Sequence, residues 1–234
     1  SDEFWTQFGF IIRELLRVTK PGRNVACHVQ QVTTTVAHDG VTGQRDFRGE
    51  VARAFMAEGF VFHGEVTIDK DPQAQAIRTK AKGLLFVQKD RDRSWLRPAL
   101  ADFVLVFRKP GENVVPLRTD EITNDEWIEW ARPIWYGIRE SQTLNAAEAR
   151  EQRDERHIAA LQLETVRRCV LLWSNPGDLV LDPFAGIGTT GYVAVQNGRH
   201  FIGCELKRSY YEAACRNIAR AVAHGVTLWD AVTA

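Results

Sequence analysis

Apolar residues recur at intervals of three and four over 4–15, which predicts an amphipathic helix that ends at the Lys-Pro-Gly stretch 20–22. A short strand is predicted over 24–29, followed by a second amphipathic helix that ends near Gly59. Apolar and other residues then alternate over 60–68, as expected for a strand with one buried face.

Two more apolar runs, over 83–87 and 102–107, predict strands on either side of a polar, basic loop. Strands that follow one another with little helix between them predict an antiparallel hairpin at one edge of a sheet.

The last third of the chain alternates helix and strand, which is typical of a parallel α/β unit. The overall prediction is an α/β fold with a mostly parallel sheet, an antiparallel edge hairpin and helices on both faces. The elements predicted here are a helix over 163–171 ended by Asn175-Pro176-Gly177, a strand over 179–182, a helix to Asn197-Gly198, a strand over 200–205, and a last helix capped by Ser209 and closed by Gly225.

The length of 234 residues is most simply accommodated by one domain. We expect it to comprise a first part over 1–109, an excursion over 110–156 without a clear period, and a final part over 157–234. Three tryptophans lie in the excursion, and we expect them to pack within the protein: Trp127, Trp130 and Trp135.

Charge is balanced over the chain, with 30 basic and 30 acidic residues, so the composition as a whole does not indicate a nucleic-acid partner. Locally it is uneven. Residues 73–98 carry seven basic side chains against two acidic ones, whereas residues 110–130 carry six acidic side chains against Arg118 alone.

The four cysteines show no C-x-x-C pairing, so neither a zinc site nor a disulfide framework is indicated. We expect Cys204 and Cys215 to be core residues in a reducing cytoplasm. No apolar run approaches the roughly 20 residues that span a bilayer, so no membrane association is predicted.

A glycine-rich loop follows the predicted strand 179–182. Gly186, Gly188 and Gly191 satisfy G-x-G-x-x-G, the pyrophosphate loop of dinucleotide-binding folds, and Glu205 ends the next strand. Taken alone, this predicts a nicotinamide-dependent oxidoreductase. However, a dinucleotide fold adds further βα units after this loop, and only 29 residues follow Glu205 here, so the sheet must be completed by earlier strands.

The segments "VLDPFAGIGTTGYVA" and "GRHFIGCELKRSYYEAACRNI" resemble the cofactor half of S-adenosylmethionine-dependent DNA methyltransferases that modify exocyclic amino groups, in their permuted β-class order. Ile187 replaces the serine of the family's D-P-F-x-G-S-G-T-T. Upstream, "DERHIAALQLETVRRCVLLWSNPGD" resembles the family's segment against the methionine part of the cofactor, without its prolines. The stretches "FGFIIRELLRVTKPGRNVACHV", "VTIDKDP", "RTKAKGLL" and "ADFVLVFRKPGE" are similar to a phage and bacterial branch of these enzymes.

This resemblance implies a Rossmann-like methyltransferase sheet in permuted order, and S-adenosyl-L-methionine as cofactor. Glycines permit close approach of the backbone, a helix N-terminus offers N–H groups to the carboxylate, and an acceptor-only carboxylate suits the ribose hydroxyls. The residues implied to bind it are His157, Gln162, Asp182, Pro183, Phe184, Ala185, Gly186, Gly188, Thr189, Thr190 and Glu205.

Double-stranded DNA is the implied substrate. Arg78, Lys80 and Lys82 are spaced by two, so on an extended segment they would point to one side and meet phosphates. A solvated hairpin, or a place for Arg78 in the catalytic cleft, are the alternatives for this stretch.

The family's catalytic motif, an Asp, Asn or Ser followed by Pro-Pro and an aromatic residue, does not occur among the eight isolated prolines. We expect it upstream of residue 1, with Ser1 beside the cleft between Asp182 and Glu205. Alternatively, another chain supplies it, or the protein is a cofactor-binding relic. The alternatives to an enzyme are a non-catalytic DNA-binding module and a subunit that needs a partner, and a homodimer is left open. The excursion over 110–156 is short for a target-recognition domain, so we expect a brief recognition site there or help from a second subunit or domain. The methylated base, adenine at N6 or cytosine at N4, is left open.

Overall fold

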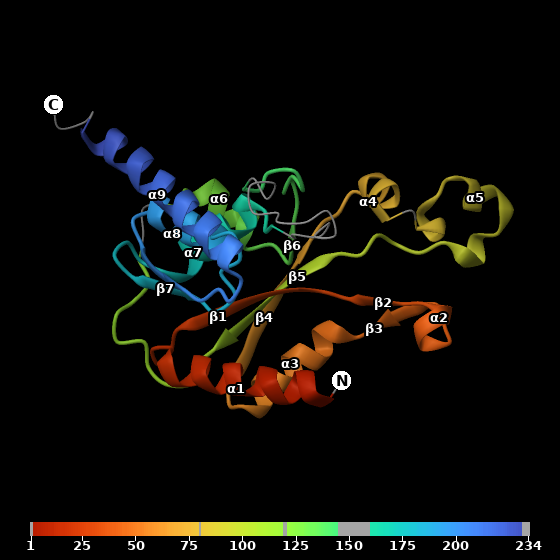
Figure 1. Ribbon diagram of the computed structural model, residues 1–234, viewed down its shortest axis with the longest axis horizontal. Helices are drawn as coiled ribbons and strands as arrows, with labels where there is room; N and C mark the ends of the chain where they lie inside the picture. Colours follow the sequence, from red (N-terminus) through yellow and green to blue (C-terminus); the bar gives the residue numbers. More distant parts are fainter. Residues whose placement is uncertain (1, 80, 119–120, 145–159, 231–234) are drawn as a thin grey trace. The chain divides into compact units, whose positions relative to one another are not determined.

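A computed structural model describes residues 2–79, 81–118, 121–144 and 160–230 (Figure 1). The chain divides into two compact units. The first unit comprises Ser1–Val115 and Glu129–Gly137, and the second comprises Pro116–Ile128 and Ile138–Ala234. Within the described ranges, no helix combines the length and apolar character needed to cross a membrane.

The first unit contains a four-stranded sheet of β1 (Asn24–Gln30), β5 (Asp102–Arg108), β4 (Val61–Ile68) and β6 (Ile134–Trp135), in that order. Strand β5 lies between β1 and β4 and runs antiparallel to both, while β4 and β6 are parallel. The antiparallel strand is therefore interior, and the described pairings are less parallel than the sequence suggested. The parallel pairs are β4 with β6 in the first unit and two further strands, Leu179–Asp182 and His200–Gly203, in the second.

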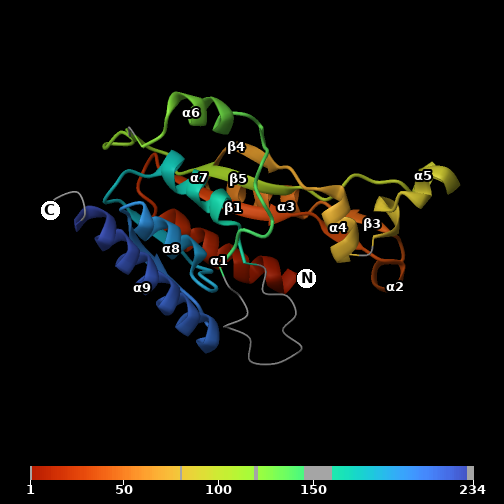
Figure 2. The same ribbon diagram turned by 90° about the horizontal axis from the view of Figure 1, so that it is seen from above.

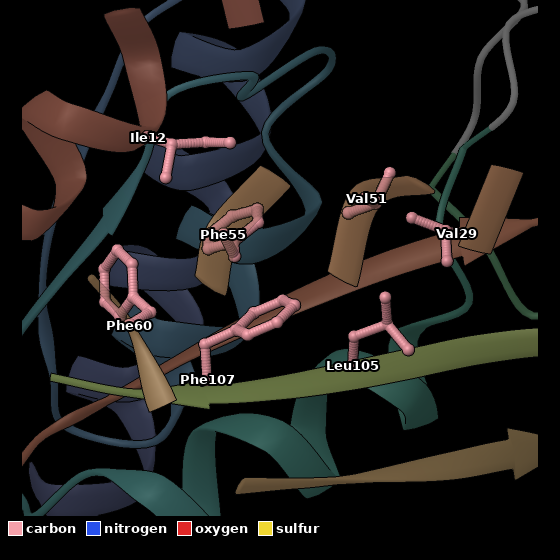
Figure 3. Packing of buried hydrophobic residues seen from close by; sticks show 7 residues of the cluster. All are labelled: Ile12, Val29, Val51, Phe55, Phe60, Leu105 and Phe107. Atoms are coloured by element: carbon pink, nitrogen blue, oxygen red, sulfur yellow. The ribbon is translucent and has the colours of Figure 1, made fainter. Parts of the chain in front are cut away.

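Two helices pack on this sheet. Helix α1 (Asp2–Val18) contacts α3 (Phe47–Ala57), and α3 contacts the strands β1, β4 and β5. The core between them is mainly aromatic and aliphatic (Figure 3); its buried members are Ile12, Val29, Val51, Phe55, Phe60, Leu105 and Phe107. Phe55 and Phe107 stack with ring centroids 4.1 Å apart and planes within 5° of parallel. The predicted helices and strands that supply these residues are thus confirmed.

Two insertions leave the sheet at the end where β1 and β4 finish. Strands β1 and β4 are both antiparallel to β5, so their carboxyl ends lie at one edge of the sheet. After β1 come β2 (Val32–Thr34), α2 (Val36–Asp39) and β3 (Gly43–Arg45), and after β4 come α4 (Pro72–Thr79), η1 (Lys82–Leu84), α5 (Val87–Arg91) and η2 (Arg93–Trp95). The predicted strand over 83–87 is wrong, because these residues form turns of helix.

The tryptophans of the excursion do not share one environment. Helix α6 (Asn124–Trp130) ends at Trp130, which is buried together with Trp135 of β6. The indole Nε1 of Trp135 donates to the carbonyl of Trp130 at 2.8 Å. The packing expected for these two is confirmed, whereas Trp127 is 59% exposed and the expectation for it is wrong.

The second unit contains helix α7 (Leu163–Trp173), strand β7 (Leu179–Asp182), helix α8 (Thr189–Gln196), strand β8 (His200–Gly203) and helix α9 (Arg208–Asp230). Strands β7 and β8 are parallel, and α8 packs against α7 and α9 (Figure 2). The α/β alternation predicted from the sequence is confirmed. Helix α9, however, continues past Gly225 to Asp230, and Ser209 lies inside it.

The cysteines are all free thiols. Burial raises the pKa of Cys27 and of Cys169 to about 12, so both remain protonated. Cys204 and Cys215 are exposed, which corrects their assignment to the core. Cys204 follows β8, a strand whose described pairing is with β7 alone, and Cys215 lies on the outer side of α9.

Candidate cofactor-binding site

The loop between β7 and α8 depends on two glycines with left-handed backbone. Gly186 has φ 53° and Gly188 has φ 85°. A Cβ on Gly188 would lie 2.9 Å from the Cα of Ala214 in α9, whereas a Cβ on Gly186 would meet only the Phe184 carbonyl oxygen, 3.9 Å away. Gly188 thus permits close packing of α8 on α9, and Gly186 leaves the face of the loop open to a ligand.

Asp182 is held in place at the carboxyl end of β7. Its Oδ1 accepts from the backbone N–H of Phe184 at 2.9 Å, and its Oδ2 accepts from the Thr190 hydroxyl at 2.6 Å. The carboxylate is therefore oriented by the loop on one side and by the first turn of α8 on the other. Each oxygen retains a lone pair for a ligand.

Glu205 lies beside the same loop, two residues beyond β8. Its Oε2 accepts from the backbone N–H of Gly186 at 2.9 Å, and its Oε1 accepts from the N–H of Lys207 at 2.8 Å. The main chain joins the two strand ends as well, since Ala185 N–H donates to the carbonyl of Cys204 at 2.9 Å. The structure thus brings Asp182, the glycine loop and Glu205 together at the carboxyl ends of two adjacent parallel strands, where α/β folds bind ligands.

Gln162 precedes α7 and is 8% exposed, and its Oε1 is buried without a hydrogen-bond partner among the described residues. The chain around it lies against the loop and α8: Ala160 packs with Ile187 and Ala213, and Leu161 and Leu163 pack beside Val193. A buried acceptor without a partner is costly, and a ligand with a donor would satisfy it. His157, and Ser1 with its expected place beside the cleft, lie outside the described residues.

The remaining predicted site residues line the loop in different ways. Phe184 is 61% exposed, so its ring is free to pack against a flat ligand. Pro183 is half-buried, whereas Ala185 and Thr189 are buried and support the backbone.

Gly191, the third glycine of the G-x-G-x-x-G spacing, lies inside α8. A Cβ there would lie 2.6 Å from Cδ1 of Ile218 and from the ring of Phe201. Its role is close packing of α8 on β8 and α9, so the third glycine does not identify the ligand.

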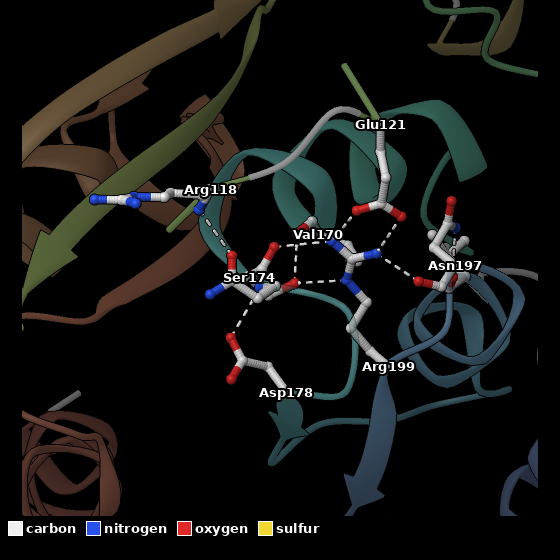
Figure 4. Close-up of polar contacts among 9 residues, drawn as sticks. Arg118, Glu121, Val170, Ser174, Asp178, Asn197 and Arg199 are labelled. Atoms are coloured by element: carbon white, nitrogen blue, oxygen red, sulfur yellow. Dashed lines mark hydrogen bonds and ion pairs between the residues drawn. The ribbon is translucent and has the colours of Figure 1, made fainter. Parts of the chain in front are cut away.

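A buried ion pair absent from the sequence analysis supports this unit (Figure 4). The Arg199 side chain is fully buried, and its guanidinium donates to both carboxylate oxygens of Glu121, at 2.8 and 2.9 Å. It also donates to the hydroxyl and carbonyl of Ser174 and to the carbonyl of Asn197. The excess of acidic residues over 110–130 is the sequence signal for such pairs. A second member of that stretch, Glu126, pairs with Arg167 at 3.0 Å.

A hollow of 470 Å³ lies beside this network. It is lined by Leu117, Arg118, Ile122, Asn124, Trp127, Leu171, Leu172, Ser174 and Asn175. Ser174 and Asn175 precede the amino end of β7, whereas the glycine loop follows its carboxyl end. The hollow is therefore separate from the candidate cofactor site.

Two of the basic residues proposed for DNA contact lie in helical turns and not on one extended segment. Arg78 is in α4 and Lys82 begins η1, while Lys80 lies outside the described residues. The contact of the three side chains with DNA stays a prediction.

Comparison with known structures shows which fold this arrangement forms. The structure of a DNA modification methylase from Thermus thermophilus in complex with S-adenosyl-L-methionine superposes with a TM-score of 0.73 at 23% identity, over 94% of this chain and 79% of that one. The cytosine-N4-specific PvuII DNA methyltransferase gives a TM-score of 0.65 at 18% identity, over 97% and 78%. The fold is that of the Rossmann-like methyltransferases.

A family model described as DNA methylase matches residues 1–216, so the chain belongs to the DNA methylase family. It is 33% identical over 125 residues to the type II methyltransferase M.BglI of Bacillus subtilis, a match that covers 51% of this chain and 32% of that protein. It is 51% identical over 53 residues to the DNA adenine methyltransferase YhdJ of Escherichia coli, which covers 23% of this chain and 18% of the relative. The matched segments thus span less than a third of these relatives.

Proposed function

We propose that this protein binds S-adenosyl-L-methionine and belongs to an enzyme that methylates an exocyclic amino group in DNA. The observation that carries the proposal is the hydrogen bond between Gly186 N–H and Glu205 Oε2, which places an acceptor-only side chain against an open glycine loop. Membership of the DNA methylase family favours this function over nicotinamide chemistry.

Each part of the cofactor has a matching group at this site. Glu205 retains acceptor capacity for both ribose hydroxyls, which are donors. Asp182, fixed by Thr190, is suited to the ammonium group, and the N-terminal turn of α8 is suited to the carboxylate. Phe184 offers an exposed ring to the adenine, and Gln162 Oε1 is a buried acceptor for a donor of the ligand. When bound, the cofactor supplies the electrophilic methyl group.

Methylation requires the target base to leave the helix and its amine to attack the methyl group in line. We propose that the acceptors holding this amine come from a segment preceding residue 1, as the family resemblance implies. One observation supports an added strand: β1, in the described part of the sheet, pairs with β5 alone and presents its other edge. A reaction on cellular DNA also implies a cytoplasmic location in a bacterial or phage-infected cell.

The cofactor proposal is tested by isothermal calorimetry with S-adenosylhomocysteine and, in parallel, NAD. We expect binding of the first only, and Glu205→Ala should weaken it by about 10- to 100-fold, as loss of charge-assisted hydrogen bonds predicts. Glu212→Ala is the matched control, because Glu212 is an exposed carboxylate on α9 in the same unit. Binding of NAD, or equal affinity of the Glu205 variant, would contradict the proposal.

The reaction is tested with tritiated S-adenosylmethionine and unmethylated bacterial DNA, followed by nucleoside analysis. A chain extended upstream to include the catalytic motif should produce N6-methyladenine or N4-methylcytosine. If that longer protein binds the cofactor but leaves every DNA unmethylated, the methyltransferase proposal fails while the cofactor site stands.

A further inference from the structure

The segment between α4 and β5 combines positive charge with exposed aromatic rings. Residues 82–97 carry five basic and two acidic side chains, although the whole chain is neutral. Phe86 is 74% exposed and Trp95 is 59% exposed. We define the cationic–aromatic surface as Lys82, Phe86, Lys89, Arg91, Arg93 and Trp95.

Exposure of this kind is unusual for a surface with no partner. Phe86 and Trp95 are accompanied by Leu85, Val87 and Leu96, each more than 40% exposed. Soluble proteins rarely present contiguous apolar groups of this size unless they bind something. The segment therefore has the character of a docking surface, and its charge indicates what docks.

The cations are available for an anionic partner. Within the described part of the chain, Lys82, Arg91 and Arg93 have no carboxylate at ion-pair distance, and Lys89 has only the adjacent Asp90 at 3.7 Å. Asp92 is occupied locally, since its carboxylate accepts from the N–H and the hydroxyl of Ser94. Those hydrogen bonds hold the pKa of Asp92 below its ordinary value, so it stays ionised and shapes the turn before Trp95.

The position of the segment fits a substrate-facing role. It connects the carboxyl end of β4 to the start of β5, at the edge of the first unit's sheet where β1 also ends. Figure 1 shows α4 and α5 following that end of β4. Open α/β sheets bind their ligands outside the carboxyl ends of the strands.

We propose that the cationic–aromatic surface grips duplex DNA, with Lys82, Lys89, Arg91 and Arg93 on phosphates and with Phe86 and Trp95 stacked on bases exposed as the duplex opens. This inference rests on the proposed function, because it assigns the DNA-contacting element of the same enzyme. Cations alone would track any polyanion, whereas the interleaved rings match a polymer that alternates phosphates with flat apolar bases.

The aromatic contribution is tested by fluorescence anisotropy with a matched duplex and with the same duplex carrying one mismatched pair. The wild-type chain should prefer the mismatched duplex, whose bases unstack more easily. Phe86→Ala and Trp95→Ala should each lower affinity by about 5-fold or more and abolish that preference, as the strength of base–aromatic stacking implies. Phe86→Tyr and Trp95→Phe should retain both. Phe10→Ala is the matched control, since Phe10 is 56% exposed on α1.

The cationic contribution is tested by the dependence of affinity on salt. Replacing Lys89, Arg91 and Arg93 together by Gln should reduce the slope of log K against log salt by about 0.9 for each phosphate that is no longer neutralised. The mismatch preference should survive in this variant. Arg53→Gln is the control, because Arg53 has a side chain 64% exposed in the same unit.

The two proposals fail in different ways. If S-adenosylhomocysteine binds and the aromatic variants hold DNA as tightly as wild type, with an unchanged salt slope in the triple variant, the surface serves another macromolecule and this inference is overturned. If S-adenosylhomocysteine does not bind at all, the proposed function is contradicted, and the inference that rests on it is contradicted as well. Thermal unfolding midpoints of the exposed-residue variants should match wild type, so loss of DNA affinity cannot be attributed to unfolding.

Discussion

Lys70 and Asp102 form an almost fully buried ion pair in the first unit. The Lys70 Nζ lies 2.7 Å from Asp102 Oδ2, and the two side chains are 3% and 8% exposed. His28 Nε2 lies 3.3 Å from the same oxygen, and Gln30 donates to Oδ1 at 2.7 Å. The carboxylate thus ties Lys70, two residues beyond β4, to the carboxyl end of β1 and the start of β5, where both insertions leave the sheet.

Loss of the lysine should strongly destabilise the first unit. Lys70→Met leaves the Asp102 carboxylate buried without its closest cationic partner, which costs about 3–5 kcal/mol in comparable pairs. Urea denaturation measures the change in the free energy of unfolding. The control is Arg208→Gln, which breaks a pair with Glu212 whose arginine side chain is 90% exposed and should cost less than about 1 kcal/mol. Equal losses in the free energy of unfolding for Lys70→Met and Arg208→Gln would contradict the conclusion that burial makes the Lys70–Asp102 pair costly to break.

The same carboxylate predicts a dependence of stability on pH. Burial raises the pKa of Asp102, but the neighbouring His28 and Lys70 side chains outweigh it, so the pKa lies below its ordinary value. A lowered pKa stabilises the fold above the unfolded value of about 3.9, and this contribution is lost as pH falls through the folded value. Urea midpoints should be measured between pH 7 and pH 2.5. The urea concentration at the midpoint should decrease once the pH is below about 4, and the decrease should be smaller in Asp102→Asn. An identical decrease in the urea midpoint of Asp102→Asn would mean that other groups cause the loss of stability in acid.

The glycine loop could be predicted because its signals are local. The strand over 179–182, the loop and the next strand follow from apolar runs and glycines within 27 residues, and the structure joins Asp182, Gly186 and Glu205 as expected. The Arg199–Glu121 ion pair could not be predicted, because its partners are 78 positions apart. A sequence shows which residues are charged but not which of them pair in the fold.

Short apolar runs and the exposed cysteines also depend on distant parts of the chain, so their structure could not be predicted from local sequence. The run Gly83–Val87 is apolar without a period, so it fits a strand and a turn of helix equally, and the tertiary context decides. Cys204 follows a strand with apolar neighbours, but its exposure depends on which strands cover β8. The division into two units crosses the excursion three times: Pro116 and Gly137 lie at two of the crossings, but the third, between Ile128 and Glu129, falls inside α6, where the sequence carries no signal for it.

Thiol labelling should separate the four cysteines into two pairs. Burial raises the pKa of Cys27 and Cys169 to about 12, so at pH 8 almost none of either thiol is the reactive thiolate. Cys204 and Cys215 are exposed and should react with iodoacetamide first. Mass spectrometry of peptides after short labelling gives the order, and urea-unfolded protein, in which all four should react alike, is the control. Early labelling of Cys169 would show that α7 opens readily.

Gly188→Ala should destabilise the second unit more than Gly177→Ala. Both glycines have left-handed backbone, with φ 85° and 77°, so each substitution carries a penalty of about 1–2 kcal/mol. Only at Gly188 would the new Cβ also lie 2.9 Å from the Cα of Ala214, whereas nothing lies within 4 Å of a Cβ at Gly177. The difference between their thermal unfolding midpoints isolates the contact between α8 and α9. Equal midpoints would mean that α9 shifts without cost.

Thr190 should act on the cofactor through Asp182. Its hydroxyl donates to Asp182 Oδ2 at 2.6 Å, so Thr190→Val preserves the shape of the side chain but frees the carboxylate to rotate. Loss of one such hydrogen bond should weaken S-adenosylhomocysteine binding by about fivefold, near 1 kcal/mol. Calorimetry measures the affinity, and Thr190→Ser, which keeps the hydroxyl, should bind like wild type. Thr190→Val should add little to Asp182→Ala, because the hydroxyl acts only by holding that carboxylate. Additive losses in the double variant would instead place Thr190 in direct contact with the ligand.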